Sequence, residues 1–157
     1  LHYPLRRQRQ MCIRDRHKSD WAVPEVLLVK RADNGQWTPV TGIADPGEEA
    51  HDCAVREVAE ETGLVVRPAA IIGVGSVGPV THTNGDLASY MTVQLRMEPV
   101  DPQAQPVVGD DESSDVGWFP ISQMPVTDPK WRLVIGDAAA QRRHPEGFAP
   151  RMGLAKR

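Results

Sequence analysis

Residues 42–64 read GIADPGEEAHDCAVREVAEETGL, and this stretch contains the most informative pattern in the chain. Residues 49–62 include no proline or glycine and are mainly helix-forming residues. Gly63 follows at the point where a helix commonly ends with a residue in the left-handed conformation. The sequence therefore predicts a helix over 49–62.

The charged residues of this predicted helix gather on one side. At about 100° per residue, alanine and valine residues occupy one part of the helix surface. The opposite arc holds Arg56, Glu57, Glu60 and Glu61. Like charges three or four residues apart destabilise a helix by about a few tenths of a kcal/mol per pair, and acids in the last turn also oppose the helix dipole. A helix selected for stability alone would avoid this arrangement.

Two interpretations of the acidic run stay open on the residues alone. Most charge runs are solvated helix faces, but such faces usually mix signs, with lysine or arginine four residues after glutamate. Residues 48–61 hold six acids against a single arginine and no lysine. The other interpretation, which we favour, is a site for a hard divalent cation that neutralises the crowded carboxylates. Oxygen ligands without histidine or cysteine favour Mg²⁺ or Mn²⁺ over zinc.

The same stretch resembles the Nudix hydrolase signature, G-x5-E-x7-R-E-U-x-E-E-x-G-U with U an aliphatic residue, at every fixed position. The matching residues are Gly42, Glu48, Arg56, Glu57, Val58, Glu60, Glu61, Gly63 and Leu64. The resemblance covers about residues 22–142, because residues 116–120 are similar to the tryptophan-containing strand that follows the signature. One departure is Thr41, where many members carry a second glycine.

The resemblance implies a reaction and a set of metal ligands. Members of this family hydrolyse the pyrophosphate linkage of a nucleoside diphosphate attached to another group, X, with Mg²⁺ or Mn²⁺ as cofactor. Glu57, Glu60 and Glu61 occupy the positions that hold metal in the family. The carbonyl of Gly42 is a further expected ligand, and Glu48 is expected to support the site.

The resemblance leaves two questions open. Arg56 is expected to orient carboxylates through charge-assisted hydrogen bonds rather than touch substrate. The general base is either Glu61 or Glu112 of the acidic loop 110–112, and a solvated loop acid is the plain alternative for Glu112. A non-enzymatic alternative is a nucleotide-sensing or protein-binding domain of the same fold without turnover. The intact acidic cluster argues against it, because a pure binder has no use for a costly group of acids.

Four residues are candidate substrate contacts: Arg31, Trp37, His82 and Tyr90. His82 and Tyr90 flank a loop that follows the signature, where the substrate pockets of the family often open. Their plain interpretation is an exposed loop histidine and a strand tyrosine. Trp37 can stack on a base, but large aromatic side chains on strands more often belong to the core.

Outward from residues 42–64, the hydrophobic pattern predicts short strands and a second helix. Strands are expected at 26–29, 37–41, 69–77, 88–97 and 116–119, and a helix from about 128 to 143. Residues 73–78 fit G-x-G-x-x-G, but Pro79 and the polar loop after it cannot begin the required helix, so we interpret them as a strand. Strands and helices without regular alternation indicate an α+β class or a layered α/β sandwich. The resemblance implies a Nudix-type α/β/α sandwich with a mixed β-sheet.

Length and composition fit one domain, because 157 residues with 40% hydrophobic and 25% charged residues can form a sizeable core. Residues 1–18 carry six basic side chains and one acid, and residues 10–16 resemble translated sequencing adapter. We expect 1–18 to be a basic arm that is disordered or foreign to the protein, so that the sheet lacks an edge strand. Residues 19–143 are expected to form the Nudix domain and 144–157 a mobile tail.

The remaining expectations concern setting and partners. The first residues lack the apolar segment of a secretory signal, and no apolar run approaches the roughly 18 residues that a membrane helix needs. Cys12 and Cys53 form neither a disulfide framework nor a metal-site spacing. We expect a cytoplasmic protein that acts on a small nucleotide, with no membrane or specific nucleic-acid partner and a homodimer as an option.

Overall fold

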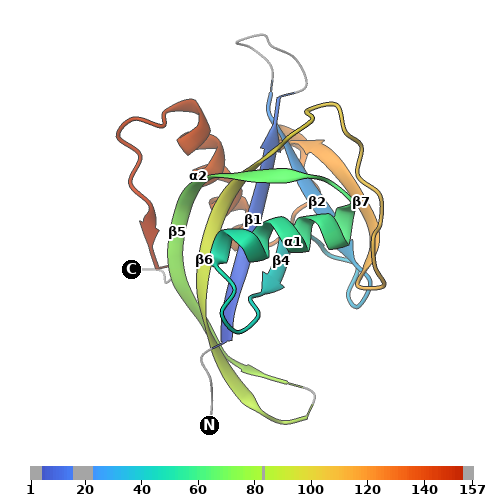
Figure 1. Ribbon diagram of the computed structural model, residues 1–157, viewed down its shortest axis with the longest axis vertical. Helices are drawn as coiled ribbons and strands as arrows, with labels where there is room; N and C mark the ends of the chain where they lie inside the picture. The colour runs from blue at the N-terminus through green and yellow to red at the C-terminus, as the bar shows by residue number, and fades with distance from the viewer. Residues whose placement is uncertain (1–4, 16–22, 83, 154–157) are drawn as a thin grey trace.

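The computed structural model describes residues 5–15, 23–82 and 84–153 (Figure 1). Its strands are β1 (Leu5–Arg14), β2 (Glu25–Arg31), β3 (Trp37–Thr38), β4 (Val40–Ile43), β5 (Val66–Thr81), β6 (Leu87–Pro99), β7 (Ser113–Pro120) and β8 (Arg151–Met152). Its helices are α1 (Ala50–Thr62), the short 3-10 helix η1 (Ile121–Gln123) and α2 (Pro129–Arg143).

The strands form one mixed sheet in the order β3-β2-β1-β6-β5-β8, with β4 paired to β1 and β7 to β2. β1 runs parallel to β6 and antiparallel to β2 and β4. In Figure 1, α1 crosses in front of these strands, and the β5–β6 hairpin extends below the rest of the sheet. A mixed sheet with helices confirms the predicted α+β class.

Each helix packs on its own side of the sheet, and the alternation of buried residues along β2 shows this. Val26 and Leu28 belong to a cluster with Val134 and Ile135 of α2. Leu27, between them, belongs to a second cluster, with Ala54 and Val58 of α1. Successive side chains of a strand point to opposite faces. The protein is therefore a sandwich of two helical layers around the sheet.

Residues 5–14 do not form the disordered arm that was expected over residues 1–18. These residues are β1, which pairs with β6 from Leu5 to Cys12. Met11, Cys12 and Ile13 are fully buried. The basic and polar residues that precede them hid the strand, because strand pairing uses the main chain and does not require apolar side chains. The sheet therefore does not lack this strand. Residues 1–4 and 16–18 of the expected arm lie outside the described residues.

Burying β1 has a local cost. Gln10 is fully buried, and neither its amide oxygen nor its amide nitrogen has a hydrogen-bond partner among the described residues. The same holds for Gln94 on the neighbouring β6. A buried polar group without a partner costs about 1–3 kcal/mol. β1 thus lies in the middle of the sheet although the Gln10 amide has no hydrogen-bond partner there.

The expected mobile tail is wrong in part. Arg151 and Met152 form β8, which pairs in parallel with β5. Arg151 also donates two hydrogen bonds to the carboxylate of Asp137 on α2, at 2.6 and 2.9 Å. These contacts attach Arg151 and Met152, which lie beyond α2, to the domain.

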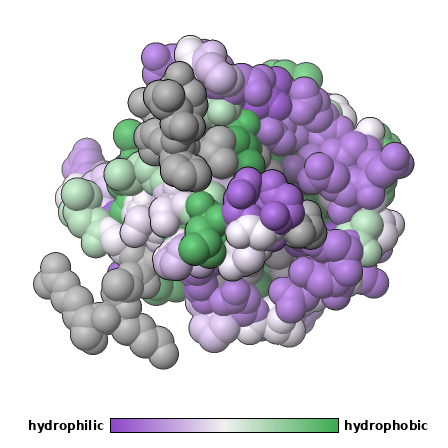
Figure 2. All heavy atoms as spheres, turned by 90° about the horizontal axis from the view of Figure 1, so that it is seen from below, coloured by the Kyte–Doolittle hydropathy of each residue, from purple (hydrophilic) through white to green (hydrophobic). Residues whose placement is uncertain are grey.

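Two further features describe the surface and the helices. From below, hydrophilic side chains cover much of the described surface, and hydrophobic atoms are scattered among them (Figure 2). Among the described residues, no helix combines the length and apolar character that crossing a membrane requires.

Candidate active site

The predicted acidic helix is α1, and its carboxyl end is well defined. Gly63 takes a φ of 68°, and its N–H donates a hydrogen bond to the carbonyl of Ala59 at 2.9 Å. A left-handed glycine cap of this kind ends a helix at little conformational cost. Glu60 and Glu61 therefore stand in the last turn of a helix whose end is fixed.

Arg56 connects the carboxylates of this region. Its Nε and Nη2 donate to the two oxygens of Glu48, both at 2.8 Å. Its Nη1 donates to Glu57 Oε1 at 2.9 Å and to Glu60 Oε2 at 3.1 Å. The N–H of Asp45 also donates to Glu48. The hydrogen bonds from Arg56 have the largest effect on Glu48, and together with the bond from Asp45 they lower its pKa to about 2. Arg56 thus ties α1 to the loop before it, in the orienting position that the resemblance implies.

Gly42 lies buried on β4, directly against Glu57. A Cβ at this position would lie 2.1 Å from Glu57 Cδ and 2.2 Å from its Cγ. Glycine is therefore the residue that lets the Glu57 side chain pass close to the β4 backbone. Burial raises the pKa of Glu57, and the Arg56 guanidinium opposes this rise.

Glu61 lies in an unfavourable environment for a negative charge. Its exposed fraction is 7%, and it forms no ion pair with any residue in the described part of the chain. Burial, followed by the charges of Asp110, Glu57 and Glu112, raises the pKa of Glu61 to about 8. A bound cation would remove this penalty, because it favours the ionised form.

The loop before β7 brings two more acids to this group. Asp110 and Glu112 both act on Glu61, and Glu112 also acts on Glu57. The sequence predicted a role for Glu112 and none for Asp110. The run of three acids at 110–112 was the available signal, but only the fold shows which of them face α1.

The donor chemistry of this group fits Mg²⁺ or Mn²⁺, because every side-chain donor is a carboxylate oxygen. However, across residues 5–15, 23–82 and 84–153 no three carboxylate, thiol or imidazole groups converge as a preformed metal site. Arg56 Nη1 lies between Glu57 and Glu60, where it supplies the positive charge. Glu57, Glu60 and Glu61 supply carboxylates that could hold a metal ion, and Gly42 lies beside Glu57.

Of the candidate substrate contacts, Arg31 lies with the acidic group. It stands at the end of β2 and donates to both carboxylate oxygens of Asp33, at 3.0 and 2.8 Å. The Asp33 hydrogen bond, with further contributions from Glu112 and Glu61, raises the pKa of Arg31. Arg31 thus places a positive charge near the carboxylates.

The other three candidates lie elsewhere. Trp37 packs edge-on against Phe119, with ring centroids 4.8 Å apart, in the cluster that includes α2. His82 and Tyr90 contact each other on the β5–β6 hairpin, with 2.6 Å between the tyrosine oxygen and His82 Nε2. The structure therefore does not gather these three side chains around α1, and Trp37 has the position of a core aromatic residue. Cys53 is fully buried, as a small core residue would be.

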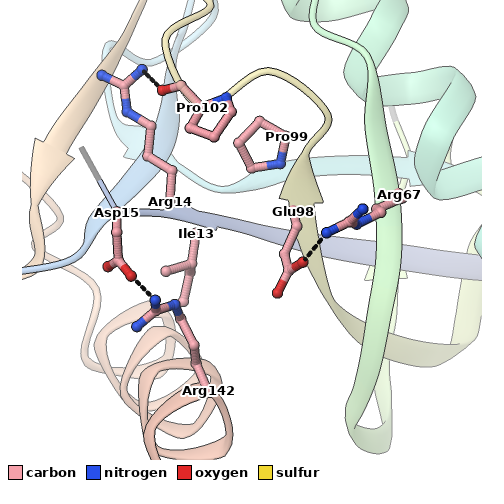
Figure 3. Close-up of a pocket in the computed structure, with 8 residues that line it drawn as sticks. All are labelled: Ile13, Arg14, Asp15, Arg67, Glu98, Pro99, Pro102 and Arg142. Atoms are coloured by element: carbon pink, nitrogen blue, oxygen red, sulfur yellow. Dashed lines mark hydrogen bonds and ion pairs between the residues drawn. The ribbon is translucent and has the colours of Figure 1, made fainter. Parts of the chain in front are cut away.

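A separate pocket of about 220 Å³ lies near the carboxyl end of β1 (Figure 3). Three arginines line it, but each already has a partner. Arg14 pairs with Glu25 and also donates to the carbonyl of Pro102, Arg67 donates to Glu98, and Arg142 pairs with Asp15. Because these charges are matched within the protein, the acidic group on α1 remains the stronger candidate for the active site.

Residues 5–140 match the model of the NUDIX domain. The chain belongs to the Nudix family. It is 33% identical over 105 residues to the NAD-capped RNA hydrolase NudC of Pseudomonas putida, covering 64% of this chain and 34% of that protein. It is 50% identical over 50 residues to a putative 8-oxo-dGTP diphosphatase of Bacillus subtilis, covering 32% of this chain and 34% of that one. The chain spans about a third of the length of these curated relatives.

Solved structures share the fold of this Nudix domain. A NUDIX hydrolase from Nitrosomonas europaea superposes with a TM-score of 0.68 at 21% identity, covering 99% of this chain and 82% of that one. A UDP-X diphosphatase superposes with a TM-score of 0.67 at 18% identity, covering 98% and 68%. At these identities the likeness shows the fold alone.

Proposed function

We propose that this Nudix protein is a Mg²⁺-dependent hydrolase, also active with Mn²⁺, that cleaves the pyrophosphate linkage of a nucleoside diphosphate derivative. The observation that carries the proposal is the acidic group on α1. Glu61 is almost fully buried without an ion-pair partner in the described chain, and Glu57, Asp110 and Glu112 add negative charge around it. A cation that binds substrate phosphates gives this costly arrangement a use.

The roles of the side chains follow from their positions. A bound metal ion would polarise phosphoryl oxygens and lower the pKa of an attacking water. Glu57, Glu60 and Glu61 would hold the metal, and Arg56 orients two of them. Either Glu61 or Glu112 would accept the proton of the water. Arg31, a second cation near these acids, would contact the negatively charged substrate.

The proposed substrate class rests on the names of the relatives, which all refer to nucleotide derivatives. The NudC proteins are NAD-capped RNA hydrolases, and the Bacillus subtilis relative is a putative 8-oxo-dGTP diphosphatase. An ADP-ribose pyrophosphatase from Streptococcus suis shares the fold at a TM-score of 0.62 and 18% identity, covering 98% of this chain and all of that one. We propose as the substrate a small nucleotide with a pyrophosphate linkage, and a cytoplasmic setting.

The experiment is product analysis on a panel of NAD⁺, ADP-ribose, a nucleotide sugar and 8-oxo-dGTP with Mg²⁺. We expect a nucleoside monophosphate and a second phosphate-bearing product from at least one of them. Glu60→Gln and Glu61→Gln should each abolish most of this turnover. Glu49→Gln is the matched control, because Glu49 is exposed and its side chain makes no cap hydrogen bond.

Binding without turnover is the second candidate, because the same fold occurs in a domain that was solved with a bound nucleotide derivative. The Nudix domain of Shewanella oneidensis NrtR was solved with ADP ribose and has a TM-score of 0.62 to this chain at 20% identity, covering 90% of each. If this chain binds ADP-ribose and releases no product with Mg²⁺ or Mn²⁺, the binding function replaces the hydrolase. Turnover that Glu60→Gln and Glu61→Gln leave unchanged would refute the metal assignment.

A further inference from the structure

The loop that carries Asp110 and Glu112 is attached directly to the carboxyl end of α1. The N–H of Val107 donates to the carbonyl of Thr62, and the N–H of Gly109 donates to the carbonyl of Glu61, both at 3.0 Å. The last carbonyls of a helix have no partner within the helix. The loop supplies these partners through its main chain, so its position is defined relative to the residues that carry the catalytic carboxylates.

The other end of the loop is fixed to β2. The N–H of Ala32 donates to the carbonyl of Glu112 at 2.9 Å, and Ser113 then begins β7 opposite Arg31. Within the loop, the N–H of Glu112 donates to Asp110 Oδ1 at 3.0 Å. Residues 107–112 therefore bridge α1 and β2, and Asp110 shapes the turn that presents Glu112.

Gly109 lies where this loop touches α1 most closely. A Cβ on Gly109 would lie 1.9 Å from the carbonyl oxygen of Glu60, 3.0 Å from its carbonyl carbon and 3.1 Å from that of Glu61. All three are backbone atoms of a helix, which cannot turn aside as a side chain can. The φ of Gly109 is outside the left-handed region, so the need for glycine here is steric and not conformational.

We propose that Gly109 is a positioning residue for the reaction, because its missing side chain lets residues 107–112 dock on α1 and hold the turn of Asp110 and Glu112 at the end of α1 where Glu61 lies. Any side chain at 109 would push the loop away from Glu60 and Glu61. The two loop acids would then move relative to the carboxylates on α1. This proposal rests on the proposed function and adds a residue that the family signature does not contain.

The test compares Gly109→Ala with Gly136→Ala in the full chain. Gly136 lies in α2, and a Cβ there would meet nothing within 4 Å. Displacing reactive groups by about 1 Å can cost about 100-fold in rate, so Gly109→Ala should lower kcat by about that factor and change KM far less. Gly136→Ala should retain wild-type kcat and KM. Equal kcat values for wild type and Gly109→Ala would overturn the proposal.

Amide hydrogen exchange gives a readout that needs no turnover. The amides of Val107 and Gly109 should exchange slowly in the wild type and in Gly136→Ala, and faster in Gly109→Ala, while the rest of α1 stays protected. If the wild type hydrolyses no nucleotide, the proposed function fails, and this exchange pattern alone decides whether Gly109 holds the loop. Unchanged exchange in Gly109→Ala would overturn the docking role.

A second pair of variants keeps the proposal falsifiable if Gly109→Ala does not fold. Asp110→Asn removes the loop charge that acts on Glu61, and Asp111→Asn removes a neighbouring exposed charge that is not among the main influences on Glu57 or Glu61. We expect Asp110→Asn to lower kcat and to raise the Mg²⁺ concentration that gives half-maximal rate. Asp111→Asn should change neither. Equal effects of the two substitutions would contradict the positioning of Asp110 by the loop.

Discussion

Glu61 on α1 and Gln10 on β1 are both withdrawn from water, and neither finds a matching partner in the described chain. Glu61 has three further acids acting on it. Gln10 is fully buried, and both of its amide atoms lack a hydrogen-bond partner in the described structure. Both arrangements cost folding free energy, because buried polar groups need hydrogen bonds or opposite charges.

The difference between the two regions lies in their surroundings. Around α1, Arg56 binds three carboxylates, Gly42 makes room for Glu57, and Gly109 makes room for the acidic loop. Several elements thus cooperate to keep the acids together. Around Gln10, nothing in the described structure uses the amide. Buried polar groups that several neighbouring residues hold in place indicate a functional site. A buried polar group that no neighbour binds indicates a residue that fits its position poorly.

The largest expected effect is on turnover when the acidic group loses a metal ligand. Glu57→Gln should lower kcat by about 1,000-fold, equivalent to about 4 kcal/mol of transition-state stabilisation. Steady-state kinetics across a range of Mg²⁺ concentrations measures this. Glu49→Gln serves again as the control. A Glu57→Gln enzyme with wild-type kcat would mean that the acids of α1 have no more role in the reaction than Gln10 of β1.

Gly42→Ala tests whether the space beside Glu57 matters. The added Cβ would occupy the place of the Glu57 side chain, so that side chain must turn away from its position. We expect a loss of about 100-fold in kcat with a smaller loss of stability, measured by kinetics and thermal unfolding. Retention of full activity would show that Glu57 needs no such fixed position.

Glu61→Gln should stabilise the metal-free protein while it destroys activity. The folded pKa of Glu61 is about 8, above the value of about 4.3 for an unfolded glutamate. The free energy of unfolding therefore falls as the pH rises through this window, and the full penalty is present above it. In EDTA, the stability gain of Glu61→Gln over wild type should be larger at pH 9 than at pH 6, by on the order of 2 kcal/mol.

Urea unfolding of both proteins at the two pH values measures this difference. The comparison between variants removes the contribution of other titrating groups. A gain that does not change with pH would mean that the Glu61 charge is not penalised in the folded protein.

The smallest effect is expected on β1. Gln10→Met replaces the unpaired amide with an apolar side chain of similar size and should raise the free energy of unfolding by about 1–2 kcal/mol. Activity should stay unchanged, because no hydrogen bond joins the Gln10 amide to an acid in the described structure. Gln36→Met is the control, since Gln36 is exposed. A loss of stability in Gln10→Met would show that the Gln10 amide is satisfied in the folded protein.

The sequence alone predicted the parts whose signals are local. The helix over 49–62 is observed as α1 from Ala50 to Thr62, ending at Gly63. The second helix is observed as α2, with the Asp128 carboxylate accepting from the N–H of Lys130 at 2.8 Å. The glycine-bearing residues 73–78 lie in β5, as predicted.

Features that depend on pairing with distant residues were missed. β1 is held by main-chain pairing with β6, more than 80 residues away in sequence, and its arginines and glutamines give no strand pattern. β8 and the docking of residues 107–112 on α1 also depend on backbone contacts across the fold. Of the site, the signature identified the acids on α1, but the nearness of Asp110 and the separation of His82 and Tyr90 from α1 required the structure.

Calorimetric titration with Mn²⁺ tests most directly whether the acids of α1 serve to bind a cation. The wild-type protein should bind Mn²⁺, and Glu57→Gln should lose most of the binding heat while Gln10→Met retains it. No heat in the wild type, or equal heat in wild type and Glu57→Gln, would contradict the metal site.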